Sequence, residues 1–170
     1  NNVMGNRRIE PFNAYRYFSD LVKTNKLLKE HRFKFVRVSG FKALEEVLSQ
    51  LFDSPAFFAL DDSDEAVMFE GNGGFYNRRV FACYLIIKSR INDMNDYENN
   101  KQICRRVFQQ ICSKLIKDSK QLEESFIHLN LNKIRFQEIE EYLLGGAIGF
   151  YFIFNVDEPM NLCYCDEEWT

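Results

Sequence analysis

Proline, histidine and long apolar runs are scarce in this chain of 170 residues, and each shortage argues against a class of protein or a kind of site. Three prolines and eight glycines are too few for a collagen-like or low-complexity protein, because those classes depend on these residues. No apolar run approaches the roughly 20 residues that cross a bilayer. The beginning of the sequence also lacks the apolar stretch of a signal peptide. We therefore predict no membrane association and a cytoplasmic location.

Potential metal ligands and catalytic bases are few and scattered. The two histidines, His31 and His128, stand outside any motif, and a catalytic triad or a multi-imidazole metal site is hard to assemble from them. Five cysteines, an odd number without the spacing of a secreted scaffold, indicate free thiols in a reducing compartment. Cys163 and Cys165 have a spacing that invites a metal ion, but no second pair completes four ligands. We predict no metal and no cofactor.

The acidic and glycine-rich segments do not match known functional loops. The acidic segment at residues 61–65 lacks the Gly at the sixth place and the Glu at the twelfth place of a calcium loop, where Ala66 and Asn72 stand. The glycine-rich segment at residues 71–74 has no Lys-Ser/Thr after it and no helix start directly behind it, so it is not a phosphate-binding loop. We predict no catalytic residues and a non-enzymatic role.

Aromatic residues are what the sequence has in quantity, with 17 Phe and 8 Tyr. Such side chains suit sheets and need burial or a partner. The apolar fraction of 46% and the charged fraction of 28% are those of a globular protein, and the length suits one domain. We predict a single α+β domain over residues 1–170, with a flexible segment at residues 1–11 and an acidic surface tail at residues 157–170.

Three helices are predicted from the spacing of apolar residues. Apolar residues recur at helical spacing after Pro11, which predicts a helix over residues 12–30. The second helix is capped by Ser39 or Gly40, and its apolar stripe consists of Phe41, Leu44, Val47, Leu48 and Leu51. The third helix begins near Asn95 and Glu98, which resemble a capping box. Its two adjacent apolar rows are Ile103, Val107, Ile111 and Leu115 beside Cys104, Phe108, Cys112 and Ile116.

Strands are predicted at residues 33–39, 55–60, 66–70, 79–89, 127–131, 133–144 and 147–156. The acidic turn at residues 61–65 would join the second and third strands into a hairpin, and residues 71–74 would form a flexible loop. The apolar run at residues 79–89 is long enough for a central strand buried on both faces. The order α-β-α-β-β-β-α-β-β-β predicts a single mostly antiparallel, mixed sheet flanked by about three helices.

A partner-binding loop is predicted next to the glycine-rich segment. Phe75 and Tyr76 would lie at its tip, beside Arg78 and Arg79. Aromatic residues and Arg dominate the hot spots of protein interfaces, so these four are our candidate interaction residues. The alternative, in which the tip folds back on its own sheet, stays open.

The charges are unevenly distributed along the chain. Residues 1–42 have a large excess of Lys and Arg, whereas residues 137–170 contain acidic residues and no Lys or Arg. The two ends can attract each other between copies or neutralise each other within one molecule, and both alternatives stay open. Lysines 23, 26 and 29 fall near one face of the first helix and could follow a phosphate backbone. A pI near 5.5 disfavours that interpretation.

From about residue 55 to residue 156, the order of elements resembles the tail-completion or tail-terminator proteins of long-tailed phages and prophages. The resemblance depends on Pro55–Leu60, on the long strand at residues 79–89 leading into one helix, and on the closing strand Gly146–Phe154. It implies a subunit without an active site that forms a homo-oligomeric ring at the head-proximal end of the tail tube. Other tail or connector proteins would be its partners, in the host cytoplasm and in the virion. A nucleic-acid-associated protein, another protein-interaction module and an enzyme that acts through two acidic residues converging in a cleft are the alternatives.

Overall fold

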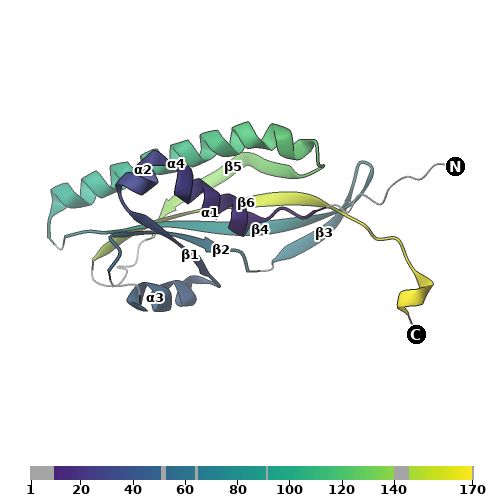
Figure 1. Cartoon of the computed structure of the whole chain (residues 1–170), viewed down its shortest axis with the longest axis horizontal. Coiled ribbons are helices and arrows are strands. Elements are labelled where there is room, and N and C mark those ends of the chain that lie inside the picture. The colour runs from purple at the N-terminus through teal and green to yellow at the C-terminus, as the bar shows by residue number, and fades with distance from the viewer. Residues whose placement is uncertain (1–9, 51–52, 64, 91, 140–145, 170) are drawn as a thin grey trace.

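A six-stranded sheet with helices on both faces forms the body of the protein in a computed structural model, which describes residues 10–50, 53–63, 65–90, 92–139 and 146–169 (Figure 1). The helices are α1 (Ala14–Thr24), α2 (Lys26–Glu30), α3 (Phe41–Gln50) and α4 (Met94–Glu123), and Asp166–Glu168 form a 3-10 turn. The strands are β1 (Phe33–Val38), β2 (Ala56–Asp61), β3 (Ala66–Gly71), β4 (Gly74–Lys88), β5 (His128–Glu138) and β6 (Ala147–Met160). The predicted α+β class with one mixed sheet is confirmed.

Strand β4 lies at the centre of the sheet, as its apolar sequence predicted. The strand order is β1-β2-β4-β6-β5, with β1 parallel to β2 and the other neighbours antiparallel. Strand β3 also pairs with β4, but at the other end of that 15-residue strand. The predicted hairpin between β2 and β3 is therefore wrong. The two strands follow each other along one edge of β4, and the Glu65 carbonyl between them accepts a hydrogen bond from the Val80 N–H at 3.1 Å.

The segment at residues 71–74 is a tight turn, not the predicted flexible loop. Gly71 and Gly74 are register partners, so only Asn72 and Gly73 connect β3 to β4. Gly73 adopts a φ of 94°, which a residue without a Cβ adopts at little cost. Strand β4 consequently begins at Gly74 instead of Arg79, and the hairpin that we predicted earlier in the chain is formed here.

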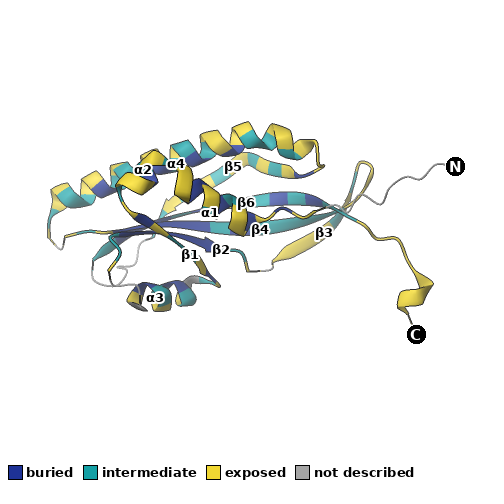
Figure 2. Cartoon of the chain, in the orientation of Figure 1, coloured by how far each residue is buried: buried dark blue, intermediate teal, exposed yellow. Residues whose placement is uncertain are grey.

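The larger hydrophobic core lies between the sheet and helices α1, α2 and α4 (Figure 2). Phe18 of α1 is fully buried, 5.6 Å between ring centroids from both Phe58 and Phe154. Helix α4 buries Cys104, Val107, Ile111 and Leu115, as its predicted rows require, although Ile116 of the second row is exposed. The core side of β6 consists of Ile148, Phe150, Phe152, Phe154 and Val156, which alternate along the strand and therefore share one face.

A smaller core lies on the opposite face of the sheet, under α3. Leu44 and Leu48 of this helix pack with Phe57 of β2 and with Tyr84 and Ile86 of β4. The predicted stripe residue Leu51 lies outside the described residues. Helix α3 lies beside β1 and β2 and does not extend to the β3 end of the sheet (Figure 1). That part of the sheet therefore has no helix over this face.

The first predicted helix and the beginning of the third differ from the prediction. The predicted helix at residues 12–30 is broken at Asn25, whose side-chain oxygen accepts a hydrogen bond from the Leu28 N–H at 2.8 Å and so caps α2. Helix α4 is capped by Asp93, which accepts from the Asp96 N–H, and not by a box at Asn95. In both places a short polar side chain directly before the helix accepts a hydrogen bond from a free N–H group of the first turn.

Two strand boundaries also differ from the prediction. The separate strands predicted at residues 127–131 and 133–144 form one strand, β5, with a register shift between Asn130 and Arg135. Residues 140–145 lie outside the described residues, as do residues 1–9 of the predicted flexible segment. Strand β6 continues to Met160, so the first residues of the predicted surface tail belong to the sheet.

Candidate interaction surface

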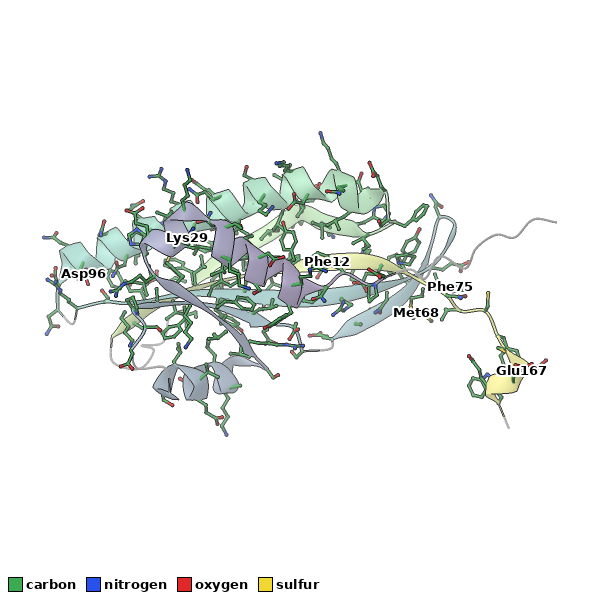
Figure 3. All side chains as sticks on the ribbon, viewed as in Figure 1. Phe12, Lys29, Met68, Phe75, Asp96 and Glu167 are labelled. Atoms are coloured by element: carbon green, nitrogen blue, oxygen red, sulfur yellow. The ribbon has the colours of Figure 1, made fainter. Side chains whose placement is uncertain are left out.

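The hairpin of β3 and the first part of β4, residues 66–79, projects beyond the helices at one end of the sheet (Figures 1 and 2). We call it the projecting hairpin. Three of its large apolar side chains are exposed: Val67 by 62%, Met68 by 55% and Phe75 by 40%. Met68 and Phe75 lie near each other at this end of the molecule (Figure 3). Exposed apolar side chains gathered on one element are typical of an interaction site.

The four predicted interaction residues all belong to the projecting hairpin, but they do not share one surface. Successive side chains of a strand point to opposite faces, so Phe75 and Arg79 lie on the face that carries Phe81 and the larger core. Tyr76 and Arg78 lie on the other face. Because the residues are part of β4 and not of a loop tip, the hairpin presents apolar groups on both of its faces.

On the α3 side, ring stacking and an ion pair fix the projecting hairpin. The rings of Phe69 and Tyr76 stack with centroids 5.7 Å apart, and the Arg78 guanidinium lies 4.9 Å from the Phe69 centroid. Arg78 donates two hydrogen bonds to Asp157 of β6, at 2.7 and 2.9 Å. These bonds raise the pKa of Arg78 further above its usual value. Bidentate pairing and cation–π contact together hold the hairpin in one orientation against β6.

On the face that carries α1, α2 and α4, Arg79 holds neighbouring segments of the chain together. The residue Glu158 is only 5% exposed, and its Oε1 accepts hydrogen bonds from Arg79 Nη1 at 3.0 Å and from the Phe12 N–H at 2.7 Å. Arg79 Nη1 also donates to the Phe12 carbonyl at 3.0 Å. The three residues tie the segment before α1 to β4 and β6. Glu158 belongs to the predicted surface tail, but it is buried because it continues the core-facing alternation of Phe154 and Val156.

The turn between α4 and β5 adds another exposed apolar side chain. Phe126 is 63% exposed and has a φ of 61°, a conformation that bulky residues rarely adopt. It occupies the left-handed position that ends α4, where Gly is the usual residue. The neighbouring His128 lies 6.3 Å from Tyr76 between ring centroids, so this turn and the projecting hairpin are at the same end of the sheet.

The remaining candidate groups are separated in the structure. Cys83 and Cys104 are buried, and burial raises the pKa of the Cys104 thiol to about 12. Cys163 and Cys165 are exposed, and His31 ends α2, far along the chain from any of them. Within the described ranges, no three His, Cys, Asp or Glu side chains gather in the way that a metal ion requires.

The acidic residues of the final stretch pair with basic residues outside residues 1–42. Besides the pairs of Arg78 and Arg79, Lys101 Nζ lies 3.2 Å from Glu138 Oε2. Lysines 23, 26 and 29 of α1 and α2 are exposed, and so are Asp166, Glu167 and Glu168. These two exposed sets of charge belong to the predicted asymmetry.

The geometry defines an α+β protein with a fixed, apolar, projecting hairpin. No protein-family model matches the chain, and no curated protein sequence matches it. Among the helices that the structure describes, none is both long and apolar enough to span a membrane.

Proposed function

We propose that this chain is a non-enzymatic assembly subunit that binds another protein surface through the projecting hairpin. The observation that carries the proposal is the exposure of Val67, Met68 and Phe75 on a hairpin whose orientation is already fixed by Arg78 and Asp157. A binding element that is ordered before it meets its partner loses little conformational entropy on binding. Apolar and aromatic side chains on such an element are suitable anchors.

The two-sided arrangement indicates the shape of the partner surface. Val67 lies on the face of the sheet that α3 covers further along. Met68 and Phe75 lie on the opposite face, which carries α1, α2 and α4. A flat partner surface would cover only one of these faces. A groove that receives the hairpin would cover both. It could also pair with the outer edge of β3, which has no strand partner among the described residues.

Self-association into a ring is the form of assembly that we propose. Insertion of the hairpin into a different surface of the next copy would be a heterologous contact. Heterologous contacts form a ring when the rotation between copies closes. The resemblance over residues 55–156 supports a tail-terminator-like subunit at the end of a phage tail tube. Other tail or connector proteins would then be further partners.

The oligomeric state tests the proposal. Native mass spectrometry and sedimentation velocity, each at low and high salt, should show a wild-type oligomer that grows with protein concentration. The double substitution Val67→Lys/Met68→Lys should give a monomer with unchanged circular dichroism. Met94→Lys is the matched control, because Met94 is 69% exposed at the beginning of α4 and away from the hairpin. A wild-type chain that stays monomeric under every condition would contradict self-association.

A nucleic-acid-associated role is the second candidate, and the exposure of Lys23, Lys26 and Lys29 favours it. Phosphate binding through these lysines would make retention on heparin or DNA fall steeply with salt. It would also be lost in the triple substitution Lys23→Glu/Lys26→Glu/Lys29→Glu. Salt-dependent retention combined with a monomeric chain would favour this role over the assembly subunit.

A further inference from the structure

A groove separates α1 and α2 from the middle of α4. It has a volume of about 400 Å³ and is lined by Leu21, Asn25, Lys26, Gln110, Ile111 and Lys114, among others. The groove exists because the chain breaks between α1 and α2 at Asn25, whose Nδ2 donates to Gln110 Oε1 of α4 at 2.9 Å. Leu21 and Ile111 lie at its base, where they belong to the core and are only 2% and 1% exposed.

The rim of the groove is basic. Lys26 and Lys114 line it from opposite sides, and both are exposed. Lys114 Nζ lies 2.9 Å from Asp118 Oδ2, which also accepts the Tyr17 hydroxyl at 2.8 Å. The Lys114 side chain is 44% exposed and has further N–H groups for a second carboxylate. Lys23 and Lys29 are exposed on the same two helices, so positive charge continues along this side of the groove.

An acidic arm, residues 161–169, leaves the sheet at the opposite end from α2 (Figure 1). Three of its apolar side chains are exposed: Leu162 by 47%, Tyr164 by 71% and Trp169 by 67%. The rings of Tyr164 and Trp169 stack with centroids 6.0 Å apart, next to the 3-10 turn Asp166–Glu168. In the described part of the chain, the hydrogen bonds and ring contacts of the arm join arm residues only.

We propose that the acidic arm of one copy docks in the groove between α1, α2 and α4 of a second copy. The carboxylates of Asp166, Glu167 and Glu168 would face Lys26 and Lys114, and the aromatic rings would lie over the groove between them. Charge complementarity favours this occupant over one with a different charge, because the arm has no basic residue and the groove lining has no acidic one. The inference rests on the proposed self-association and names one of its contacts.

The position of the arm favours a second copy over the arm's own molecule. Residue Met160, where the arm begins, is the register partner of Phe75 in the projecting hairpin. The arm extends from there away from the body of its own chain (Figure 1). Nine residues span at most about 30 Å when extended, which is enough to reach across an interface to the helices of a neighbour.

The size of the contact sets its expected strength. Tyr and Trp each bury about 150–250 Å² when they are covered, so this arm buries less than the roughly 800 Å² per partner of a stable interface. Docking of the arm alone should therefore be weak. It should add to the contact made by the projecting hairpin and not replace it.

The only tryptophan of the chain makes the arm directly observable. A peptide of residues 161–170 is titrated with the full-length Trp169→Ala chain, which contains no tryptophan and keeps the groove. We expect the peptide emission to move to shorter wavelength and its anisotropy to rise. Lys26→Glu/Lys114→Glu in the receptor should weaken binding at least tenfold. Lys42→Glu/Lys133→Glu, with the same change in net charge on α3 and β5, should leave it unchanged.

Each other outcome overturns the inference in a different way. No change in emission or anisotropy, or equal binding by the two charge-reversed receptors, would remove the groove as the site. A wild-type Trp169 emission that is blue-shifted at every protein concentration would show that the arm docks in its own molecule. A DNA duplex that binds through Lys26 and Lys114 when the peptide does not would assign the lysines to nucleic acid.

The same measurements separate the inference from the proposed function. If the wild-type chain oligomerises, Val67→Lys/Met68→Lys abolishes the oligomer, and the peptide does not bind, then the assembly role stands and the arm contact is wrong. If the peptide binds through the groove lysines and Val67→Lys/Met68→Lys leaves the association of the full-length chain unchanged, the arm contact stands and the hairpin-mediated ring is wrong.

Discussion

Arg79 and Glu158 form an ion pair, 3.0 Å between Nη1 and Oε1, inside the layer that joins the sheet to the beginning of α1. The carboxylate also accepts the Phe12 N–H, so one side chain satisfies groups from two parts of the chain. Burial makes the pair sensitive to the loss of either partner, since the group left behind stays in a poorly hydrated position.

Glu158→Ala should therefore lower the free energy of unfolding by about 3 kcal/mol, because Arg79 and the Phe12 N–H lose their partner. Urea unfolding followed by circular dichroism measures the change. Glu167→Ala is the matched control: the residue is exposed in the acidic arm, and its removal should change stability by less than about 0.5 kcal/mol. Equal effects of the two substitutions would contradict a structural role for the pair.

Phe126→Gly should stabilise the isolated subunit by about 1 kcal/mol. The left-handed backbone of Phe126 is strained for a residue with a Cβ, and the exposed ring offers little packing in return. Phe126→Ala removes the ring and keeps the strain, so it should not stabilise. Thermal unfolding of both variants distinguishes the two causes, and a Gly variant less stable than wild type would show that the ring packs.

The five thiols should react in three groups with a disulfide reagent at pH 8. Cys163 and Cys165 are exposed in the acidic arm and should react at once, whereas Cys112 is part-buried, has a raised pKa and should react slowly. Cys83 and Cys104 should react only after unfolding, because burial raises the pKa of both. Rapid modification of a third thiol in the native chain would contradict the burial of these residues.

Stability should decrease at alkaline pH. The pKa of Cys104 is raised to about 12 in the folded chain, compared with about 8.5 in an unfolded one, because burial penalises the thiolate. The folded state therefore favours the protonated thiol. Its contribution is complete below pH 8.5 and is lost as the pH rises from there towards 12. Burial and the nearby Asp118 also raise the pKa of Tyr17, which extends the loss above pH 10.

Urea midpoints measured in reducing buffer between about pH 7 and pH 10.5 should follow this decline. Between its unfolded and folded pKa values, one thiol that is deprotonated only in the unfolded state lowers the free energy of unfolding by at most about 1.4 kcal/mol per pH unit. Cys104→Ala lowers stability at every pH but should reduce the slope above pH 9 by about this amount. An unchanged slope would show that other groups cause the alkaline decline.

Most elements could be predicted from local patterns, because a long periodic segment defines its own buried face. The rows of α4 at spacing four and the alternation of Phe150, Phe152 and Phe154 in β6 are such segments. The run that became β4 was recognised as central from its apolar character alone. Each of these predictions needed only the residues within the element.

What the sequence could not show is which strand pairs with which. Strands β2 and β3 are close in sequence with a short acidic connection, which favours a hairpin, but both pair with β4. Partner choice depends on contacts across the whole sheet, and local composition does not encode them. The helix break at Asn25 had a local signal, an Asn before Lys-Leu-Leu, which the continuous apolar spacing outweighed.

The candidate surface was predicted in residues but not in arrangement. Phe75, Tyr76, Arg78 and Arg79 were recognised by type, whereas their division between two faces follows from the strand that they turned out to occupy. Val67, Met68 and Phe126 were missed, because the exposure of an apolar residue depends on whether other elements of the fold pack over it. The positive φ of Phe126 likewise has no signal in the sequence.

The projecting hairpin lies beyond the helices and has no share in either hydrophobic core. Apart from Phe69, Tyr76, Arg78 and Arg79, which make the contacts that fix the hairpin, its residues are therefore free of the packing demands that restrict the body of the chain. Related chains that recognise different neighbours can diverge at this hairpin while their folding remains intact, so rapid sequence change confined to residues 66–77 would be the evolutionary signature of a partner-specific contact.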